Sequence, residues 1–499
     1  MGSTRICQVK STGLERLKPE SCRIEVTFSL DNPAQEPYPK NQALRANPDA
    51  MNSRRRISAF WTTFALAIQS LHIASAGLVL VPSDGAQNIC PDTVMRLTFD
   101  APPRLGRAGR IEIRNSAGEL ADSLDLELND SHGAQARSIG GAKFTNYPVL
   151  ISGNTAIICP HPGTLNYGQA YRVSVEAGVF ATVTNQLGWT FNTRRSGPNT
   201  NATQVTVAAD GSGDFCTVQG AVDFVPAGNT QPREIYIRNG VYEEIVYVTN
   251  KHHLSFRGED RHRTVFDYTN NENFNHRGLA WNIYRQTFGV QADDFALENL
   301  TVRNATPRRG SQAEALRIDG ERCVVRNVDF YSFQDTLKLS GTVFVSGCYI
   351  EGDVDFIWGY GTCYFTNCEI KCVTSGACVT QIRNDAAHFG DVFVDCRLTH
   401  APGVTNAILS RIEVGRFPYS HVAWINCAMD DHIRPDAWRF TPGQNPPDNL
   451  RFWEYKTTGV SGGMLVDVTA RAAISRQLTD EEATRMRDAR HVLGGWAPE

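Results

Sequence analysis

Polar and apolar residues alternate in short segments through residues 77–193, and turn residues separate these segments. An alternation with a period of two places every second side chain on the same face of a β-strand. About seven short strands in a region of this length are typical of a β-sandwich. The clearest strands are predicted at 94–99, 110–114, 156–159, 171–175 and 188–192.

From residue 205 onward the pattern changes to a repeat. A short apolar strand with Asn, Gly or Asp at its bend returns every 20 to 31 residues. A strand and turn that recur at this period indicate a solenoid, here a parallel β-helix in which each repeat is one coil. The repeated segments are 297–302, 325–330, 345–350, 365–370, 393–398 and 424–429.

Four cysteines occupy equivalent positions in successive repeats: Cys348, Cys368, Cys396 and Cys427. Stacked coils would place them in an inward-facing ladder, where a free cysteine packs as a small hydrophobic residue. Disulfides and a metal site are the alternatives, but no Cys-x-x-Cys pair with nearby histidines supports a metal site. The twelve histidines show no metal-ligand spacing along the chain either, so the sequence predicts no metal.

A targeting segment is predicted at residues 51–76. Met51 is followed by arginines at 54–56, an apolar run over 57–68 and Ala74-Ser75-Ala76, which together are typical of a secretory signal peptide cleaved before Gly77. Either Met51 is the true start, or the segment is a signal anchor with a cytoplasmic tail. The run is short for a membrane span, which favours the first interpretation. Residues 1–50 are expected to be disordered in both cases.

Length and charge narrow the function classes. A chain of 499 residues can form two or three domains. Without residues 1–76, 39 of its 49 basic and 47 of its 53 acidic residues remain, a net charge near −8. This negative charge argues against nucleic acid and an anionic membrane as partners, whereas an esterified, neutralised polyanion remains compatible. The predicted organisation is 1–50 extension, 51–76 signal peptide, 77–195 sandwich, 196–203 linker and 204–499 β-helix.

Two aspartates are the first candidates for chemistry. Asp335 lies in Gln334-Asp335-Thr336-Leu337, and Asp355 lies in Asp355-Phe356-Ile357-Trp358-Gly359. They are twenty residues apart, about one coil, so stacking would bring them together. Two carboxylates whose surroundings separate their pKa values can act as a nucleophile and as an acid and base on an ester.

Further motifs occur in one order after residue 204. They include Asp210-Gly211-Ser212-Gly213-Asp214-Phe215, Gly240-Val241-Tyr242-Glu243-Glu244 and Gly310-Ser311-Gln312-Ala313, followed by the two aspartate motifs. Together they resemble the pectin methylesterases (pectinesterases) over essentially all of residues 204–499. The resemblance implies a right-handed parallel β-helix and an activity without metal or cofactor. The segment that opens with Val81-Pro82-Ser83-Asp84-Gly85-Ala86 resembles bacterial Ig-like modules of secreted enzymes.

The resemblance also implies catalytic roles. Asp355 would be the nucleophile that attacks the methyl ester, and it would stay ionised beside an arginine. Asp335 would protonate the departing methanol and then deprotonate the hydrolytic water. Gln312 and Gln334 would donate hydrogen bonds to the oxyanion of the tetrahedral intermediate.

Two residues are candidates for the catalytic arginine, because the family's Leu-Gly-Arg-Pro-Trp is altered here. Arg411 follows Leu409-Ser410 and is favoured, while Arg416 follows Gly415 and would otherwise serve in substrate binding. No Trp follows either arginine.

Three aromatic residues are candidates for substrate binding: Trp358, Tyr331 and Trp438. Trp358 stands where the family usually has Phe, and it can either line the substrate groove or fill the core.

The sequence therefore predicts an all-β protein, a parallel β-helix preceded by a small β-sandwich, that acts as a carboxylic ester hydrolase. It would remove methyl groups from homogalacturonan (pectin) through an aspartyl acyl-enzyme and release methanol. A secreted monomer, extracellular or periplasmic and free of the membrane after signal cleavage, is expected. The alternatives are a calcium-dependent β-helical pectate lyase and a non-catalytic polysaccharide-binding surface protein. No obvious aspartate cluster for calcium supports the first, and the presence of both aspartates and both glutamines argues against the second.

Overall fold

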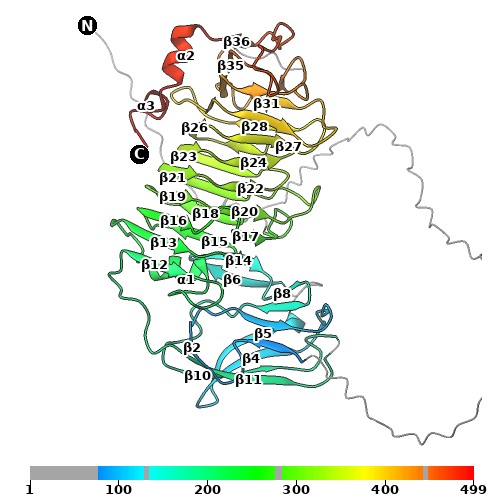
Figure 1. The fold of residues 1–499 in the computed structure, drawn as a ribbon, viewed down its shortest axis with the longest axis vertical. Helices are drawn as coiled ribbons and strands as arrows, with labels where there is room; N and C mark the ends of the chain where they lie inside the picture. Colours follow the sequence, from blue (N-terminus) through cyan, green and yellow to red (C-terminus); the bar gives the residue numbers. More distant parts are fainter. Residues whose placement is uncertain (1–76, 129–133, 182, 276–283, 442–447, 499) are drawn as a thin grey trace, which may run out of the picture. The chain divides into compact units, whose positions relative to one another are not determined.

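The computed structural model describes residues 77–498, with gaps at 129–133, 182, 276–283 and 442–447. The predicted extension at 1–50 and signal peptide at 51–76 lie outside the described residues. Among the helices that are described, none is long and apolar enough to cross a membrane. The described chain belongs to one compact unit in which a smaller β-region precedes a long stack of strands (Figure 1).

The smaller region consists of two packed sheets, so it is a β-sandwich. Its four-stranded sheet has the order β1 (Val79–Val81), β3 (Met95–Thr98), β9 (Thr155–Ile158), β8 (Val149–Ser152). Its five-stranded sheet has the order β2 (Ala86–Ile89), β11 (Leu187–Thr193), β10 (Ala170–Val175), β4 (Arg110–Asn115), β5 (Leu120–Asp125). A 3-10 helix, η1 (Leu126–Leu128), and a hairpin of β6 (Gln135–Ile139) and β7 (Ala142–Asn146) complete the region.

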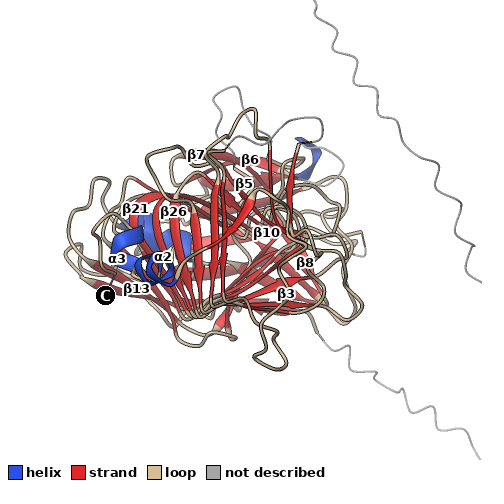
Figure 2. Cartoon of the chain, turned by 90° about the horizontal axis from the view of Figure 1, so that it is seen from above, coloured by secondary structure: helices blue, strands red, loops and turns tan. Residues whose placement is uncertain are grey.

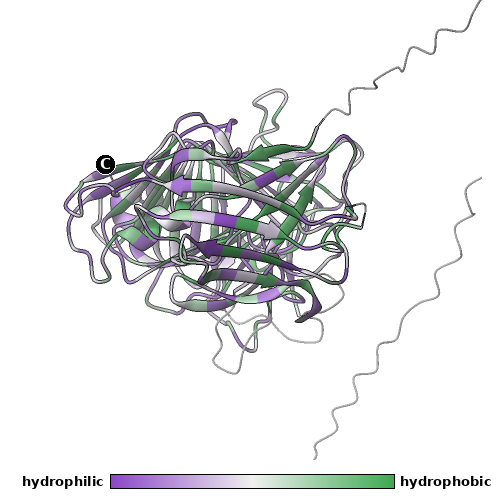
Figure 3. Cartoon of the chain, turned by 90° about the horizontal axis from the view of Figure 1, so that it is seen from below, coloured by the Kyte–Doolittle hydropathy of each residue, from purple (hydrophilic) through white to green (hydrophobic). Residues whose placement is uncertain are grey.

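The sandwich core follows from the alternation in the sequence. Ile111 and Ile113 of β4 and Val173 of β10 are buried, while the residues between them are more exposed. Hydrophobic and hydrophilic residues alternate along these strands when the molecule is seen from the sandwich end (Figure 3). The five predicted strands correspond to β3, β4, β9, β10 and β11, and each observed end lies within one residue of the predicted end.

Residues after 203 form a parallel β-helix, as predicted. Its eight-stranded sheet consists of β14 (Gly240–Tyr242), β17 (Thr264–Tyr268), β20 (Thr301–Asn304), β22 (Asp329–Tyr331), β24 (Tyr349–Gly352), β27 (Glu369–Cys372), β30 (Arg397–His400) and β33 (Ala428–Met429). Successive strands in this sheet are parallel and come from successive coils.

The remaining strands of the coils form one seventeen-stranded sheet. Each coil supplies it with two strands, or with one long strand that spans both positions, as β21 and β23 do. The strands are β12 (Gln204–Val207), β13 (Arg233–Ile237), β15 (Val246–Thr249), β16 (Leu254–Gly258), β18 (Phe288–Gln291), β19 (Ala296–Glu298), β21 (Leu316–Arg326), β23 (Leu337–Ser346), β25 (Ile357–Gly359), β26 (Thr362–Thr366), β28 (Cys378–Ile382), β29 (Asp391–Val394), β31 (Ile408–Ile412), β32 (His421–Ile425), β34 (Trp438–Phe440), β35 (Arg451–Tyr455) and β36 (Ser475–Gln477).

The repeated sequence segments form one corner of the coil. Each contains the end of a strand in the seventeen-stranded sheet, a bend, and the start of a strand in the eight-stranded sheet, so it is not one strand as predicted. The bend residue has a positive φ between 52° and 63°, a conformation that Gly, Asn and Asp adopt at the lowest cost. The six bend residues are Asn299, Asn327, Gly347, Asn367, Asp395 and Asn426.

The cysteines at equivalent positions stack inside the coils. Cys348, Cys368, Cys396 and Cys427 are at most 2% exposed, and each thiol interacts with the next along the stack. All eleven cysteines in the described residues are free thiols in this structure. The ladder is therefore part of the apolar core, as the sequence pattern predicts.

Short helices occur near the beginning and near the end of the β-helix region. Near the C-terminus, α2 (Asp480–Met486) and α3 (Ala489–Val492) pack against strands of the seventeen-stranded sheet (Figure 2). Thr479 and Glu482 form a capping box that satisfies the first amides of α2. Near the start, α1 (Val218–Phe224) buries Val218, Ala221 and Val222 against the first coils.

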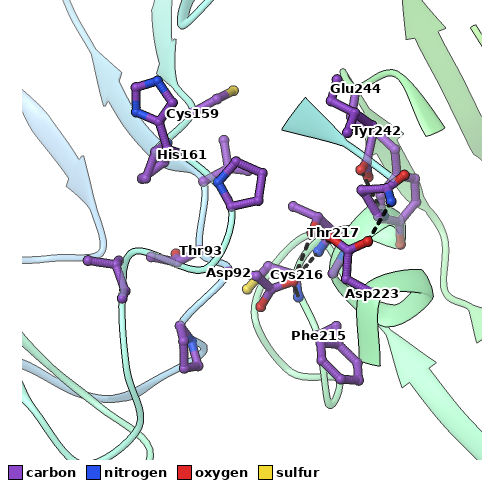
Figure 4. Close-up of a pocket in the computed structure, with 18 of the residues that line it drawn as sticks. Asp92, Thr93, Cys159, His161, Phe215, Cys216, Thr217, Asp223, Tyr242 and Glu244 are labelled. Carbon is purple, nitrogen blue, oxygen red and sulfur yellow. Dashed lines mark hydrogen bonds between the residues drawn. The ribbon is translucent and has the colours of Figure 1, made fainter. Parts of the chain in front are cut away.

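The sandwich contacts the first coils beside α1 (Figure 4). Asp92 Oδ2 accepts hydrogen bonds from the amides of Cys216 and Thr217 at 2.9 and 2.8 Å, and Glu244 accepts from two amides at the start of α1. Phe144 of the β6–β7 hairpin packs against Tyr247 and other apolar side chains of the β-helix. A cavity of about 390 Å³ lies at this junction.

Candidate active site

Asp335 and Asp355 lie on neighbouring coils at the corner that leads from the eight-stranded sheet into the seventeen-stranded sheet. Asp335 follows β22 and precedes β23, and Asp355 lies between β24 and β25. The amide of Asp335 donates to the carbonyl of Val354 at 3.0 Å, so the two aspartates are separated by about one strand spacing of 4.8 Å. Both are nearly buried, and both have a positive φ, 68° and 47°.

Arg411 of β31 binds Asp355 with two parallel hydrogen bonds. Its Nε donates to Asp355 Oδ1 at 2.6 Å, and its Nη2 donates to Oδ2. This bidentate geometry fixes both position and orientation of a carboxylate. The thiol of Cys378 also contacts Asp355, and burial beside that carboxylate raises the pKa of Cys378 well above its usual range. Arg411 therefore holds Asp355 at the position where the sequence predicts a nucleophile.

Asp335 belongs to a separate buried network centred on Arg285. Arg285 Nη2 lies 2.6 Å from Asp335 Oδ2, its Nε lies 2.9 Å from both Glu314 oxygens, and its Nη1 lies 3.0 Å from Glu272. Burial raises the pKa of Asp335 well above its usual range; Arg285 opposes the increase, while Glu314 and Asp355 add to it. Asp335 is therefore favoured as the protonated member of the pair.

Sequence reasoning missed Arg285, Glu314 and Glu272 as site residues. Their contacts depend on the stacking of three coils, and no short motif encodes this stacking. The one available signal was the charge of Arg285 and Glu314, since residues of these types are rarely buried unless paired.

Gln312 and Gln334 lie on the same edge as the aspartates. The amide of Ala313 donates to the carbonyl of Gln334 at 3.1 Å, and Gln334 in turn pairs with Val354 across the next coil. Gln312, Gln334 and Asp355 therefore occupy three successive coils at one corner, and both glutamines are half-buried. Side-chain amides in this position can donate to an oxygen bound next to Asp355.

The two tryptophan candidates are buried, and for Trp358 this is one of the two positions that the sequence left open. Trp358 is only 4% exposed, and its ring lies beneath the guanidinium groups of Arg383 and Arg285, 4.9 and 5.6 Å from the ring centre. Trp438 is 3% exposed and stacks on Phe452 in the core, 4.7 Å between ring centres. The structure thus places both tryptophans in the packing beneath the surface.

Of the other two predicted contacts, Tyr331 is half-buried and Arg416 is exposed. Tyr331 is on β22, where it packs against Tyr349 at 5.3 Å. Arg416 has a side chain that is 74% exposed and is 3.7 Å from Glu413. Sequence reasoning missed Tyr360, which is 48% exposed, two residues after Trp358, and hydrogen-bonded to Arg383 at 3.2 Å. Tyr360 is the accessible aromatic side chain of this cluster.

Taken together, the corner carries a carboxylate held by an arginine fork, a second carboxyl whose burial favours its protonated form, and two amide donors. Such a set can perform nucleophilic substitution at an ester carbonyl with acid and base assistance. Among the described residues, two groups of three side chains could hold a metal ion, Cys90–Asp92–Cys216 and His400–Asp430–His432, and neither includes these aspartates. The cavity at the sandwich junction is also lined by other residues.

Comparisons with known proteins agree on one family. The pectinesterase family model matches residues 204–495. Pectinesterase 31 of Arabidopsis thaliana is 34% identical over 290 residues, which is 56% of this chain and 89% of the relative. Pectinesterase 1 of Olea europaea is 33% identical over 293 residues, 56% of this chain and 75% of the relative.

Solved structures give the same result. A crystal structure of a pectin methylesterase in complex with a hexasaccharide matches with a TM-score of 0.51 and 27% identity, over 60% of this chain and 99% of the other. The pectin methylesterase from carrot matches with a TM-score of 0.53 over 60% of this chain and 95% of the other, and at 24% identity this likeness concerns the fold alone.

Proposed function

The chain belongs to the pectinesterase family, and we propose that it demethylates pectin through an acyl-enzyme formed on Asp355. It is a carboxylic ester hydrolase. The observation that carries the proposed mechanism is the fork between Arg411 and Asp355 next to the buried Asp335. Each carboxyl then has one chemical task.

In the first half of the reaction, an oxygen of Asp355 attacks the carbonyl carbon of a methylated galacturonate. The carbonyl oxygen becomes an oxyanion, and the amides of Gln312 and Gln334 donate to it. Removing one donor of this kind typically costs about 3–4 kcal/mol of transition-state stabilisation. The C–O bond to the methoxy group then breaks, Asp335 gives its proton to the departing oxygen, and methanol leaves.

In the second half, Asp335 is a carboxylate and accepts a proton from water. The resulting hydroxide attacks the carbonyl of the acyl-enzyme, and a second oxyanion forms at the same amides. When the bond to Asp355 breaks, the product leaves as a galacturonic acid that loses its proton to solvent, and both aspartates return to their starting forms. The same residue acts as acid and then as base because its pKa is poised by burial against the charge of Arg285.

The substrate and location follow from the same proposal. Methyl-esterified polygalacturonate is the expected substrate and sole expected partner, and Tyr360 is a candidate contact for a sugar ring. The net charge near −8 that remains after residue 76 suits an esterified polymer better than a fully charged one. Export through the segment at 51–76, a monomeric state, and the Ig-like, bacterial character of residues 77–195 stay predictions.

The test is methanol release from highly methylated pectin, followed by coupled oxidation of methanol and by titration of the acid produced. We expect turnover in the purified protein and none in Asp355→Asn. To detect the acyl-enzyme, hydroxylamine is added during turnover. It should intercept the galacturonyl group as a hydroxamate at the expense of galacturonate, and Asp355→Asn should form none. Methanol release by Asp355→Asn at the wild-type rate would contradict the assignment.

Two other outcomes would favour the alternative functions. An ultraviolet-absorbing unsaturated product whose formation stops with chelator would indicate a lyase. Pectin binding without methanol release at micromolar enzyme would indicate a binding protein.

A further inference from the structure

Three residues that the proposed mechanism does not use lie together on neighbouring coils. His400 ends β30, and Asp430 and His432 follow β33 on the next coil. The two strands pair in parallel with Leu398 opposite Met429, and the amide of Ala407 donates to the carbonyl of His432 at 2.8 Å. This register brings the three side chains to the corner that follows the eight-stranded sheet.

The side chains converge on a small volume. One ligand atom from each of His400, Asp430 and His432 lies within 4.8 Å of the others. His400 Nε2 is 3.9 Å from Asp430 Oδ2, and the two imidazole rings are 4.6 Å apart between centres. These separations are close to those between ligands of one metal ion but too long for direct hydrogen bonds.

His432 provides an independent indication. It is 1% exposed, and both of its ring nitrogens are buried without a hydrogen-bond partner among the described residues. A buried polar atom that lacks a partner has lost its hydrogen bonds to water without replacement, so such groups usually bind something. Among the described residues, Gln286 is the one other side chain with two such atoms.

His400 is oriented as a ligand would be. Its Nδ1 lies 2.9 Å from the carbonyl oxygen of Ala401. A carbonyl oxygen can only accept, so Nδ1 carries the hydrogen and Nε2 keeps its lone pair, which faces Asp430. A backbone carbonyl that fixes the tautomer in this way is the usual second partner of a metal-bound histidine.

We propose that His400, Asp430 and His432 bind one Zn²⁺ ion. Two imidazole nitrogens and one carboxylate oxygen are three of the four tetrahedral ligands that zinc prefers, and a water molecule would take the fourth position. Calcium and magnesium are excluded as occupants because they select oxygen ligands. The sequence predicted no metal because the two histidines are one coil apart along the chain, at positions 400 and 432, and only the stacking of coils brings them together.

The ion would tie two coils together at some distance from the chemistry. Asp355 follows β24, and β27, β30 and β33 are the next three strands of the same sheet. At about 4.8 Å per coil the ion would lie roughly 10–15 Å from Asp355. Zinc is therefore expected to stabilise the last coils without taking part in ester hydrolysis, and the proposal does not depend on the proposed function.

The test uses the purified full chain, stripped with chelator and desalted, and titrated with ZnCl₂ alone. We expect one ion per chain by calorimetry and by elemental analysis. X-ray absorption should show two imidazole nitrogens and oxygen at about 2.0–2.1 Å. At a hundredfold excess over the dissociation constant, the Tm should rise by about 5 °C.

Two ligand variants and one matched control decide the assignment. His400→Gln and Asp430→Asn change partly exposed residues, so the fold should persist, and each should weaken zinc binding at least tenfold. His388→Gln removes an exposed histidine that also pairs with an aspartate, at 2.7 Å from Asp385, and should leave the affinity unchanged. No binding below about 100 µM zinc, or equal affinity in Asp430→Asn and wild type, would overturn the proposal and leave His432 solvated by a buried water molecule.

Discussion

Replacement of Arg411 by lysine separates the orientation of Asp355 from its charge. In the native site, two guanidinium nitrogens donate to the two carboxylate oxygens. Lysine keeps the positive charge but offers a compact ammonium, which can hold one oxygen and cannot fix the plane of the carboxylate. Arg411→Lys should therefore leave Asp355 paired but poorly aimed.

The size of the effect follows from the lost hydrogen bond. A hydrogen bond to a charged group contributes about 1.5–3 kcal/mol, and misplacement of a nucleophile adds to that loss. We expect turnover to fall a hundredfold or more, about 3 kcal/mol of barrier, with a much smaller change in KM. Arg411→Met should also lower the stability of the fold, because it leaves the buried Asp355 without its counter-charge. Such a loss costs about 3–5 kcal/mol for a fully buried pair. The cost is smaller here because the Arg411 side chain is 43% exposed.

The assay is methanol release under saturating and limiting pectin, with thermal unfolding as a check on folding. Arg416→Lys is the matched control, since Arg416 lies at the surface against Glu413. It should keep kcat within about twofold of wild type and at most alter KM. If Arg411→Lys retains more than a tenth of native turnover while Arg416→Lys loses a hundredfold, the role of the fork is wrongly assigned.

Three other predictions test the site and the core. Asp355→Asn and Asp335→Asn should each lose at least three orders of magnitude in turnover with unchanged circular dichroism, because nucleophile and acid act as a unit; more than a tenth of native activity in either would reassign that residue. Glu314→Gln removes a charge that raises the pKa of Asp335, so the alkaline limb of the pH profile of kcat/KM, where Asp335 loses its proton, should move to lower pH, and an upward move would contradict the network. In a folded chain begun at residue 77, a thiol reagent should label at most Cys159, the one thiol in the described residues that is not fully buried, and should label all eleven cysteines after unfolding; rapid labelling of several thiols in the folded chain would contradict the buried cysteine ladder.

The sequence was most informative where structure is set locally. A bend with positive φ limits the residue to Gly, Asn or Asp, so the corner residues such as Asn327 and Asn367 repeat visibly along the chain. The same constraint applies at Asp335 and Asp355, which also have a positive φ and lie at the opposite end of the strands of the eight-stranded sheet. The family motifs could therefore be found, and the stacking of the two aspartates followed from their spacing.

The sequence was least informative where contacts cross coils. Arg285 reaches Asp335 across fifty residues, and the loop lengths between them decide the contact. The direction of a side chain at a strand end also depends on its coil, which is why Trp438 could be taken for a surface residue although it lies in the core. His400 and His432 were missed for the same reason.

The contact between the sandwich and α1 has a consequence for self-association. A stack of coils is an open-ended array, and the outer edge of its first strand, β12, is covered by the turn that ends at Phe215. Phe215 bridges to Val207, and the amide of Phe215 donates to the carbonyl of Thr206 at 3.1 Å. An unpaired strand edge can template the addition of another chain. Asp92 of the sandwich holds the start of α1, and α1 packs on β12 and β13 beside that edge. The sandwich thus holds in place the turn and helix that cover this edge, since Asp92 binds the amides of the two residues after Phe215. A chain without residues 77–195 should expose more of the edge and self-associate, as seen by light scattering, while it still releases methanol.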